Sequence, residues 1–188
     1  MHADTLRSHM DTTGEYRIFK AYYGVRIYKS NIQGKCDSLT FTQSDSIIRM
    51  YRDPVIWNDS TQISANFIEI HTKNNNISKF LLDEAAFMIS MESPTQFNQM
   101  KGKDMTGYFS DNKLSKVEVN GNAETIYYTK DKNDVMGVNK AISSNMMIGF
   151  KNNEVTRVTL LNKPEGTLYP LGDLKESTLS GFQWLIKW

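Results

Sequence analysis

Two segments of the chain align with each other without a gap, and this internal repeat constrains the fold more than any other feature. The segments are residues 104–119 and 145–160, and their alignment places methionine on methionine and phenylalanine on phenylalanine. A third copy begins near Asn66 with a slip of one residue, and a looser fourth copy begins at Asp37. Copies that recur at intervals of roughly 30 to 40 residues predict stacked structural units that share one continuous core.

Each copy contains two short apolar runs separated by a polar break. In the second run of one copy, Val117 and Val119 fall on one side of the chain, while Lys116 and Glu118 fall on the other. Alternation with a period of two predicts a half-buried β-strand. The breaks are rich in Asn and Asp, which tolerate the backbone of tight hairpin turns; they lie at residues 74–76, 111–113 and 152–154. We therefore predict an all-β fold of stacked antiparallel hairpins, with unrelated hairpins in an ordinary sandwich as the alternative.

The length and charge of the chain limit its organisation. Its 188 residues are enough for one substantial core, and no linker divides them. With 22 Lys and Arg against 21 Asp and Glu, the net charge of +1 gives no general attraction to nucleic acid, so no nucleic-acid partner is expected. We predict one domain at residues 16–170, preceded by a flexible segment at 1–15. Residues 171–188 are expected to form a cap or tail of the same domain.

Two segments are ambiguous in their secondary structure. Residues 81–89 are rich in helix-forming residues, but the repeat places the arm of a hairpin there, so we assign them to strand. Residues 171–179 could form one or two helical turns, and Phe182 and Trp184 belong to an apolar end that follows them. We expect this tail to cover the last open hairpin, because terminal repeats need a cap. A tail that binds a partner is the alternative.

The residues that usually carry chemistry are few and scattered. His2, His9 and His71 show no metal-ligand spacing, and Cys36 is the only cysteine. A nucleophilic Cys36 would need a base, for which His71 is the only candidate, so we expect a buried and inert thiol. The chain has no glycine-rich phosphate loop and no Gly-x-Ser-x-Gly or His-Glu-x-x-His motif. We therefore expect no enzymatic activity, no metal and no cofactor.

A series of short motifs, in a fixed order along the chain, resembles one known family. Residues 33–39 read Gln-Gly-Lys-Cys-Asp-Ser-Leu, and residues 53–57 read Asp-Pro-Val-Ile-Trp. Shorter matches follow at residues 62–63, 68–70, 102–105, 121–122, 127–128, 137–141 and 167–170. They resemble the OstA-like (LptA-like) family of lipopolysaccharide-transport proteins, and the resemblance covers most of the chain from Tyr16 to Trp184.

The resemblance implies an antiparallel β-jellyroll shaped like a half-open tube, or β-taco. Its apolar interior would shield the acyl chains of lipopolysaccharide, or a related lipid, during transfer across the periplasm of a Gram-negative bacterium to the outer membrane. Each methylene hidden from water is worth about 0.8 kcal/mol, so such a carrier needs apolar surface more than reactive groups. The implied partners are the lipid, other OstA-like transport components bound through strand edges, and further copies stacked head to tail. Both a periplasmic protein and a domain associated with the outer membrane would fit.

The strand alternation predicts which side chains face that interior. The apolar residues expected to line the lumen and bind lipid are Val25, Ile27, Leu39, Phe41, Ile48, Met50, Ile68, Ile70, Phe80, Leu82, Val117, Val119, Ile148, Phe150, Val158 and Leu160. Two other readings stay open. One is a structural repeat domain, such as the periplasmic domain of an outer-membrane assembly protein, with a core filled by its own side chains. The other is a β-solenoid enzyme acting on carbohydrate, which would need clustered carboxylates.

Overall fold

Every regular element of the computed structural model is a β-strand, within the described residues 1–29, 32–74, 76–111, 113–131, 134–152 and 154–187. The strands are β1 (Thr5–Met10), β2 (Arg17–Lys29), β3 (Ile32–Thr42), β4 (Ile47–Tyr51), β5 (Val55–Asn58), β6 (Thr61–Ser64), β7 (Phe67–Lys73), β8 (Asn76–Asp83), β9 (Ala86–Ser93), β10 (Gln96–Gly102), β11 (Asp104–Ser110), β12 (Lys113–Asp131), β13 (Asp134–Lys151), β14 (Glu154–Leu161) and β15 (Glu165–Tyr169). All of their pairings are antiparallel. The predicted all-β fold of stacked hairpins is confirmed.

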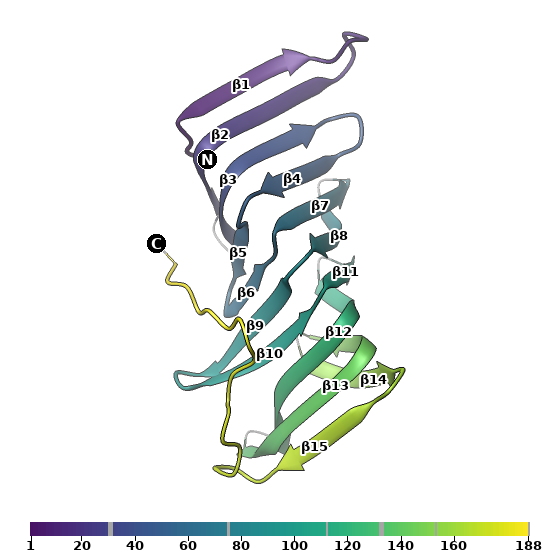
Figure 1. The fold of residues 1–188 in the computed structure, drawn as a ribbon. Coiled ribbons are helices and arrows are strands. Elements are labelled where there is room, and N and C mark those ends of the chain that lie inside the picture. The colour runs from purple at the N-terminus through teal and green to yellow at the C-terminus, as the bar shows by residue number, and fades with distance from the viewer. Residues whose placement is uncertain (30–31, 75, 112, 132–133, 153, 188) are drawn as a thin grey trace.

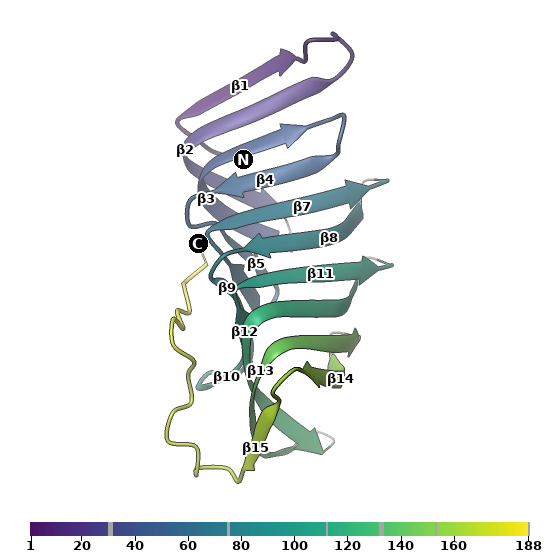
Figure 2. The same cartoon turned by 45° about the vertical axis from the view of Figure 1, so that its right-hand side comes forward.

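The strands form one sheet that is folded along its middle into two leaves (Figures 1 and 2). The first leaf contains β1, β4, β7, β8, β11 and β14, and the second leaf contains β5, β6, β9, β10 and β15. The long strands β2, β3, β12 and β13 cross from one leaf to the other and contribute one half to each. The result is the open, twisted antiparallel jellyroll that the motifs implied.

The fold between the leaves is made by a repeated corner, in which two consecutive residues have positive φ. These pairs are Tyr23–Gly24, Arg52–Asp53, Glu84–Ala85, Gly121–Asn122 and Asn162–Lys163. The carbonyl of the first residue in each pair accepts a hydrogen bond of 2.7–3.3 Å from a facing backbone N–H. The donors, in the same order as the pairs, are Asp4, Asp37, Asn66, Lys103 and Ser144. Left-handed backbone costs a non-glycine residue roughly 1–2 kcal/mol, so the corner geometry outweighs the local preference of most of these residues.

The hairpin tips at the far side of the first leaf share a second repeated detail. A register shift lies beside the tip, and a side-chain hydroxyl donates to the backbone carbonyl across it. The donors and acceptors are Ser78 to His71 at 3.0 Å, Ser115 to Tyr108 at 2.9 Å, and Thr156 to Gly149 at 3.2 Å. Ser115 and Thr156 are equivalent in the gapless alignment, so the sequence repeat is a structural repeat. Asn75, Asn112 and Asn153 of the expected turns lie outside the described residues.

The two leaves bury one apolar core between their inner faces. Small side chains lie where the leaves converge, among them Ala65, Ala86 and Ala123, which are at most 7% exposed. A Cβ atom added to Gly102 would lie 2.5 Å from Cγ1 of Val119, so the corner has no room for a larger side chain there. The distance between the leaves is therefore set by residue size along the corner.

Two expectations about particular segments need correction, and a third is confirmed with one interruption. Residues 5–10, expected within a flexible N-terminal segment, form β1 and pair with β2 along their length. Residues 81–89 are mostly strand, as predicted, but the corner at Glu84–Ala85 divides them between β8 and β9. The described tail, residues 171–187, contains no helix, and it crosses the outer face of the second leaf instead of covering the last hairpin (Figures 1 and 2).

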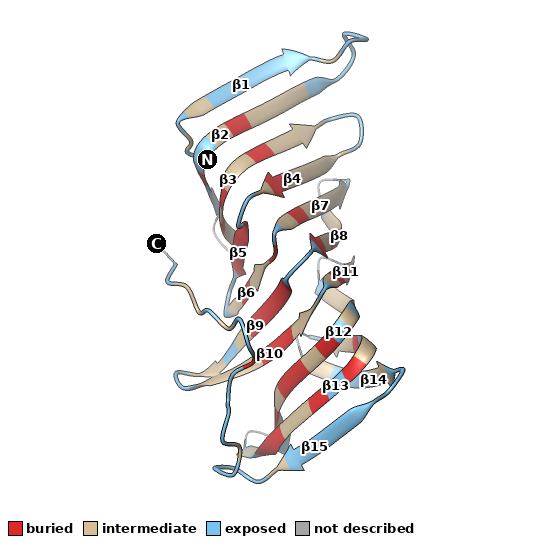
Figure 3. Cartoon of the chain, viewed as in Figure 1, coloured by how far each residue is buried: buried red, intermediate tan, exposed pale blue. Residues whose placement is uncertain are grey.

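The tail lies there because the outer face of the second leaf is itself apolar. Phe87, Ile89, Ile126, Tyr128 and Val138 form a second buried cluster on that face, and the tail covers it with Leu174, Leu179, Phe182 and Trp184. Buried positions are accordingly frequent along β9, β12 and β13, whereas β1 and β15 are largely exposed (Figure 3). Uncovered, this cluster would leave a contiguous apolar patch in water.

Candidate functional site

Two parallel rows of side chains line the inner face of the first leaf. Cross-strand neighbours in the row next to the corners are Leu6, Ala21, Leu39, Met50, Ile68, Leu82, Met105, Val119, Met146 and Leu160. The next row toward the tips is Ser8, Phe19, Phe41, Ile48, Ile70, Phe80, Gly107, Val117, Ile148 and Val158. Both rows cross the whole leaf from β1 to β14, so they form an almost unbroken apolar surface along the molecule.

A third row faces them from the second leaf. It consists of Ile27, Gly34, Ile56, Ile63, Met88, Met100, Thr125, Ala141 and Gly166. Most of its large side chains pack in the same core as the first two rows. We call the space bounded by these three rows the trough.

Burial in the trough decreases from the corners to the tips. Met50 and Val119, in the row next to the corners, are both 0% exposed. One row further out, Phe80, Val117 and Ile148 are still buried, whereas Phe41 and Ile70 are half-buried. Nearer the tips, Phe109 and Phe150 are half-buried. At the C-terminal end of the molecule, Val158 is 47% exposed. The trough is therefore filled by its own side chains along the corners and open along its mouth.

The residues expected to line a lumen all lie on the inner side of the two leaves. Those of the first leaf fall in its two rows, except Phe150, which packs against the core nearer the tip of β13. Val25 and Ile27 lie on the second leaf. The structure brings these residues together along one surface, and their contact with a lipid stays a prediction.

Sequence reasoning missed several residues of the same surface. Phe19, Ile63 and the facing methionines of the second leaf were absent from the expected set, because their segments belong to no clear repeat copy. Met105 and Met146 were also absent, although they occupy equivalent positions in the gapless alignment and both are 1% exposed. Apolar identity at equivalent repeat positions was the signal that could have found them.

Methionine is prominent in the trough. The buried members are Met50, Met88, Met100, Met105 and Met146. A thioether side chain is unbranched and has several rotatable bonds, so it adapts its shape to its neighbours more easily than Leu or Ile. Aromatic residues complete the surface: a Cβ atom on Gly107 would lie 2.2 Å from the ring of Phe80, which therefore covers that glycine.

The outer face of the first leaf is charged instead. The Arg49 guanidinium donates to Glu69 at 3.1 Å, and Glu69 also bonds His71 at 3.0 Å. Lys116 donates to Glu118 at 2.7 Å, and this hydrogen bond lowers the pKa of the Glu118 carboxyl. Partly exposed pairs of this kind add little stability, but they keep this face hydrated.

The candidate groups for catalysis are not brought together. Cys36 packs in the core between the leaves, where burial raises the pKa of its thiol to about 12. His71 lies on the outer face of the first leaf beside Glu69. The only candidate base is thus on the opposite face from the thiol. Within the described ranges, no group of three or more His, Cys, Asp or Glu residues is arranged to hold a metal ion.

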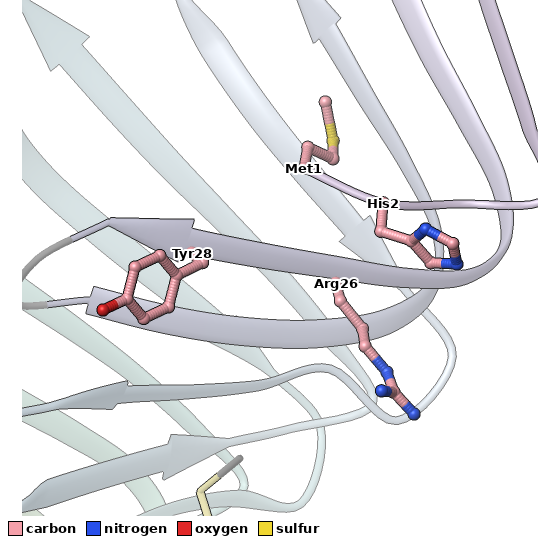
Figure 4. Close-up of a pocket in the computed structure, with 4 residues that line it drawn as sticks. All are labelled: Met1, His2, Arg26 and Tyr28. Carbon is pink, nitrogen blue, oxygen red and sulfur yellow. The ribbon is translucent and has the colours of Figure 1, made fainter.

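Two shallow pockets lie outside the trough. The first has a volume of about 410 Å³ and is lined by Met1, His2, Arg26 and Tyr28 beside β2 (Figure 4). The second has a volume of about 600 Å³ and is lined by Tyr51, Arg52, Asp53, Asn66 and Phe67 at a corner. Neither brings two carboxylates together, as glycoside hydrolysis commonly requires.

An antiparallel sheet folded into two leaves around a continuous apolar trough is the LptA-like β-jellyroll. The solved structure of LptH, the LptA-homologous periplasmic component of the conserved lipopolysaccharide transport device from Pseudomonas aeruginosa, resembles this chain with a TM-score of 0.56. The match covers 74% of this chain and 95% of that chain at 11% sequence identity. The LptA-like fold expected from the short motifs is confirmed.

The other comparisons add no closer relationship. No protein-family profile matches the chain, and no curated protein sequence matches it. The described residues include no helix of the length and apolar character needed to cross a membrane. At this level of identity, the similarity to LptH establishes the fold alone.

Proposed function

We propose that this chain carries lipopolysaccharide or a related lipid, with the acyl chains held in the trough during passage through the periplasm to the outer membrane. The observation that supports this most is the almost unbroken double row of apolar side chains from β1 to β14, interrupted in one row by Ser8 and Gly107. Neighbouring strands lie about 4.8 Å apart, so a surface across this many strands has room for several acyl chains side by side. A carrier of this kind binds by surface and shape, and it needs no reactive group.

The gradient of burial supports a specific mode of loading. Acyl chains enter at the mouth, where Phe41, Ile70 and Phe150 are half-buried. They then displace the flexible side chains deeper in the trough, above all Met50 and Met146, which repack at low cost. The headgroup stays outside the mouth, in water.

The ends of the molecule support assembly with similar domains. β1 has no described strand partner other than β2, and β14 has none other than β13, so each presents a free strand edge. Exposed apolar residues gather on the last strands: Met136, Ile142, Met147, Val158, Leu161 and Leu168. Strand edges of this kind pair readily with a neighbour. We propose head-to-tail contacts with further copies or with other transport components of the same fold. We also propose that the chain has no catalytic activity.

A structural role is the second candidate, because the row next to the corners is filled by its own side chains. In that case the two leaves stay closed, and the chain serves as a rigid spacer between domains. The carrier and the spacer differ in one respect: only the carrier brings lipid into contact with the inner face.

Photo-crosslinking from two adjacent residues separates the two functions. Phe109 packs against the core at the mouth, whereas Tyr108 lies on the outer face, where its hydroxyl donates to Glu118 at 3.0 Å. We would replace each with p-benzoylphenylalanine in the full chain and irradiate it with labelled lipopolysaccharide. The carrier predicts strong crosslinking from position 109 and little from position 108. Equal labelling, or none at position 109 in a folded protein, would reject it.

A further inference from the structure

The tail is held on the second leaf by a glutamine that imitates a neighbouring strand. The side-chain amide of Gln99 on β10 donates to the carbonyl of Ser177 at 2.7 Å and accepts from the N–H of Leu179 at 2.8 Å. One side chain thus satisfies the carbonyl of one tail residue and the N–H of the residue two further on. This is the pair of groups that an adjacent β-strand would bind.

The same contact recurs six residues along the tail. Gln62 on β6 donates to the carbonyl of Gln183 at 2.7 Å and accepts from the N–H of Leu185 at 2.9 Å. Gln62 is 1% exposed, and its Oε1 atom also accepts from the indole N–H of Trp57 at 3.1 Å. Both contacts share one pattern: a polar residue supplies the carbonyl, and a leucine two residues later supplies the N–H. The outer face of the second leaf is therefore a backbone-binding surface.

A third glutamine, Gln33, lies in the same cross-strand row as Gln62 and Gln99. The cross-strand row that contains them reads Tyr28, Gln33, Trp57, Gln62, Ile89 and Gln99. Glutamine recurs at every second strand of this row, a spacing of about 10 Å. Yet the Oε1 atom of Gln33 is buried and has no hydrogen-bond partner among the described residues. Buried polar atoms of this kind are rare in native proteins and call for a partner.

The described tail does not reach this third glutamine. Its last described residue, Lys187, donates to the carbonyl of Asp59 at the turn after β5. Beyond β5 the row continues through Gln33 on β3 to Tyr28 on β2, which is 68% exposed. Tyr28 also lines the 410 Å³ pocket with Met1, His2 and Arg26, beside β2 (Figure 4). A further segment would thus meet a glutamine amide first and a pocket next.

We propose that Gln33 is a third docking position for extended polypeptide backbone, formed when its half-buried side chain turns the amide outward, and occupied by a segment of a partner protein that lies in line with the tail. The segment presents a carbonyl and, two residues later, the N–H of a leucine, and its following side chain enters the pocket beside Tyr28. A peptide is the occupant because this surface already binds a peptide twice by the same geometry. This docking is independent of lipid carriage, since it uses the opposite face of the second leaf.

The test uses the full chain and a fluorescein-labelled peptide with the sequence of residues 177–187. The attached tail keeps its own two positions, because its effective concentration greatly exceeds that of a free peptide. Fluorescence anisotropy should show saturable binding of one peptide per chain. Gln33→Leu should weaken binding about tenfold or more, since both amide hydrogen bonds are lost. Gln96→Leu, at a half-buried glutamine of the same leaf outside this row, should leave binding unchanged.

Gln33→Glu keeps the size and polarity of the side chain, and it tests the proposal if the leucine variant does not fold. It retains the acceptor and loses the amide donor, so it should also weaken binding. Absence of binding to the native chain would overturn the proposal, as would unchanged binding by a folded Gln33 variant. Binding that falls with Gln99→Leu but not with the Gln33 variants would mean that the peptide displaces the tail, which also overturns it.

Discussion

The two leaves have similar inner faces and opposite outer faces. The first leaf presents charged pairs such as Lys116 and Glu118 to water, whereas the second leaf buries Ile89 and Ile126 under the tail. One leaf is thus packed on one side, and the other is packed on both. Regions with fewer buried contacts open at a lower free-energy cost. If the molecule widens to take a lipid, we expect the first leaf to move and the second leaf to stay fixed.

Removing the tail should abolish this difference between the leaves, and it should have the largest effect on stability. Without residues 171–188, the cluster around Ile126 would face water, and Gln62 and Gln99 would lose their partners. We expect the free energy of unfolding to fall by more than about 5 kcal/mol, because the apolar outer face of the second leaf would lose its cover. We also expect concentration-dependent aggregation, because that whole apolar face, and not only a strand edge, would be exposed to water. Urea unfolding and light scattering measure both. Truncation after Leu185 keeps both glutamine contacts and is the matched control; a stable, monomeric chain without the whole tail would contradict the expectation.

A charge placed at two depths of the trough tests the gradient of burial. Val119→Asp puts a carboxyl in the fully buried row and should cost about 4 kcal/mol or more. Phe150→Asp lies at the half-buried mouth, where water reaches the carboxyl, and should cost less than half as much. Urea unfolding of both variants gives the comparison. Similar losses in the free energy of unfolding would show that water is excluded from the mouth as fully as from the row next to the corners.

Replacing glutamines of one row with leucine compares a satisfied amide with an unsatisfied one. Gln99→Leu leaves the carbonyl of Ser177 and the N–H of Leu179 without partners and should cost about 1–3 kcal/mol. Gln33→Leu removes a buried oxygen that has no partner, so its free energy of unfolding should be unchanged or slightly higher. Chemical denaturation of the two variants measures the difference. A reversed order would show that the Gln99 contacts hold the tail only weakly.

The thiol of Cys36 should affect stability only at alkaline pH. Burial raises its pKa from the ordinary value of 9.0 to about 12, so the folded state holds the proton more tightly than the unfolded state. The associated stability is fully present below pH 9 and is lost as the pH rises from 9 toward 12. Between pH 8 and pH 11 the free energy of unfolding of the native chain should fall by up to about 3 kcal/mol more than that of Cys36→Ser. Equal pH profiles would show that the thiol is hydrated in the folded state.

The first leaf could be predicted from the sequence because only one of its faces is buried. Val117 and Val119 alternate with Lys116 and Glu118, and this alternation identified both the strand and its inward face. In the second leaf, the consecutive residues Ala86, Phe87, Met88 and Ile89 are all buried, so no alternation marks its inner face. When both faces of a sheet are buried, the sequence pattern does not show which face points inward.

The corners and the path of the tail could not be predicted, because both depend on contacts between residues that are distant in sequence. The corner pairs include Arg52–Asp53 and Glu84–Ala85, which share no residue type that signals left-handed backbone. Their conformation is fixed by hydrogen bonds between strands that are distant in sequence. The tail is placed by Gln62 and Gln99, and a glutamine in a strand looks like an ordinary exposed residue until its partner is known. Long-range contacts decide both features.

The hydrogen-bonded corners have a mechanical consequence. Each corner carbonyl is tied to the backbone of a facing corner, so the angle between the leaves cannot change at one corner without straining the next. Bending is therefore shared within each pair of facing segments, and the continuous strand pairing of the sheet carries it from pair to pair. A guest that wedges the leaves apart at one end should widen them at the other end too. If copies stack and carry lipid as proposed, such elastic coupling along the axis would let an occupied domain prepare its neighbour to receive the same cargo.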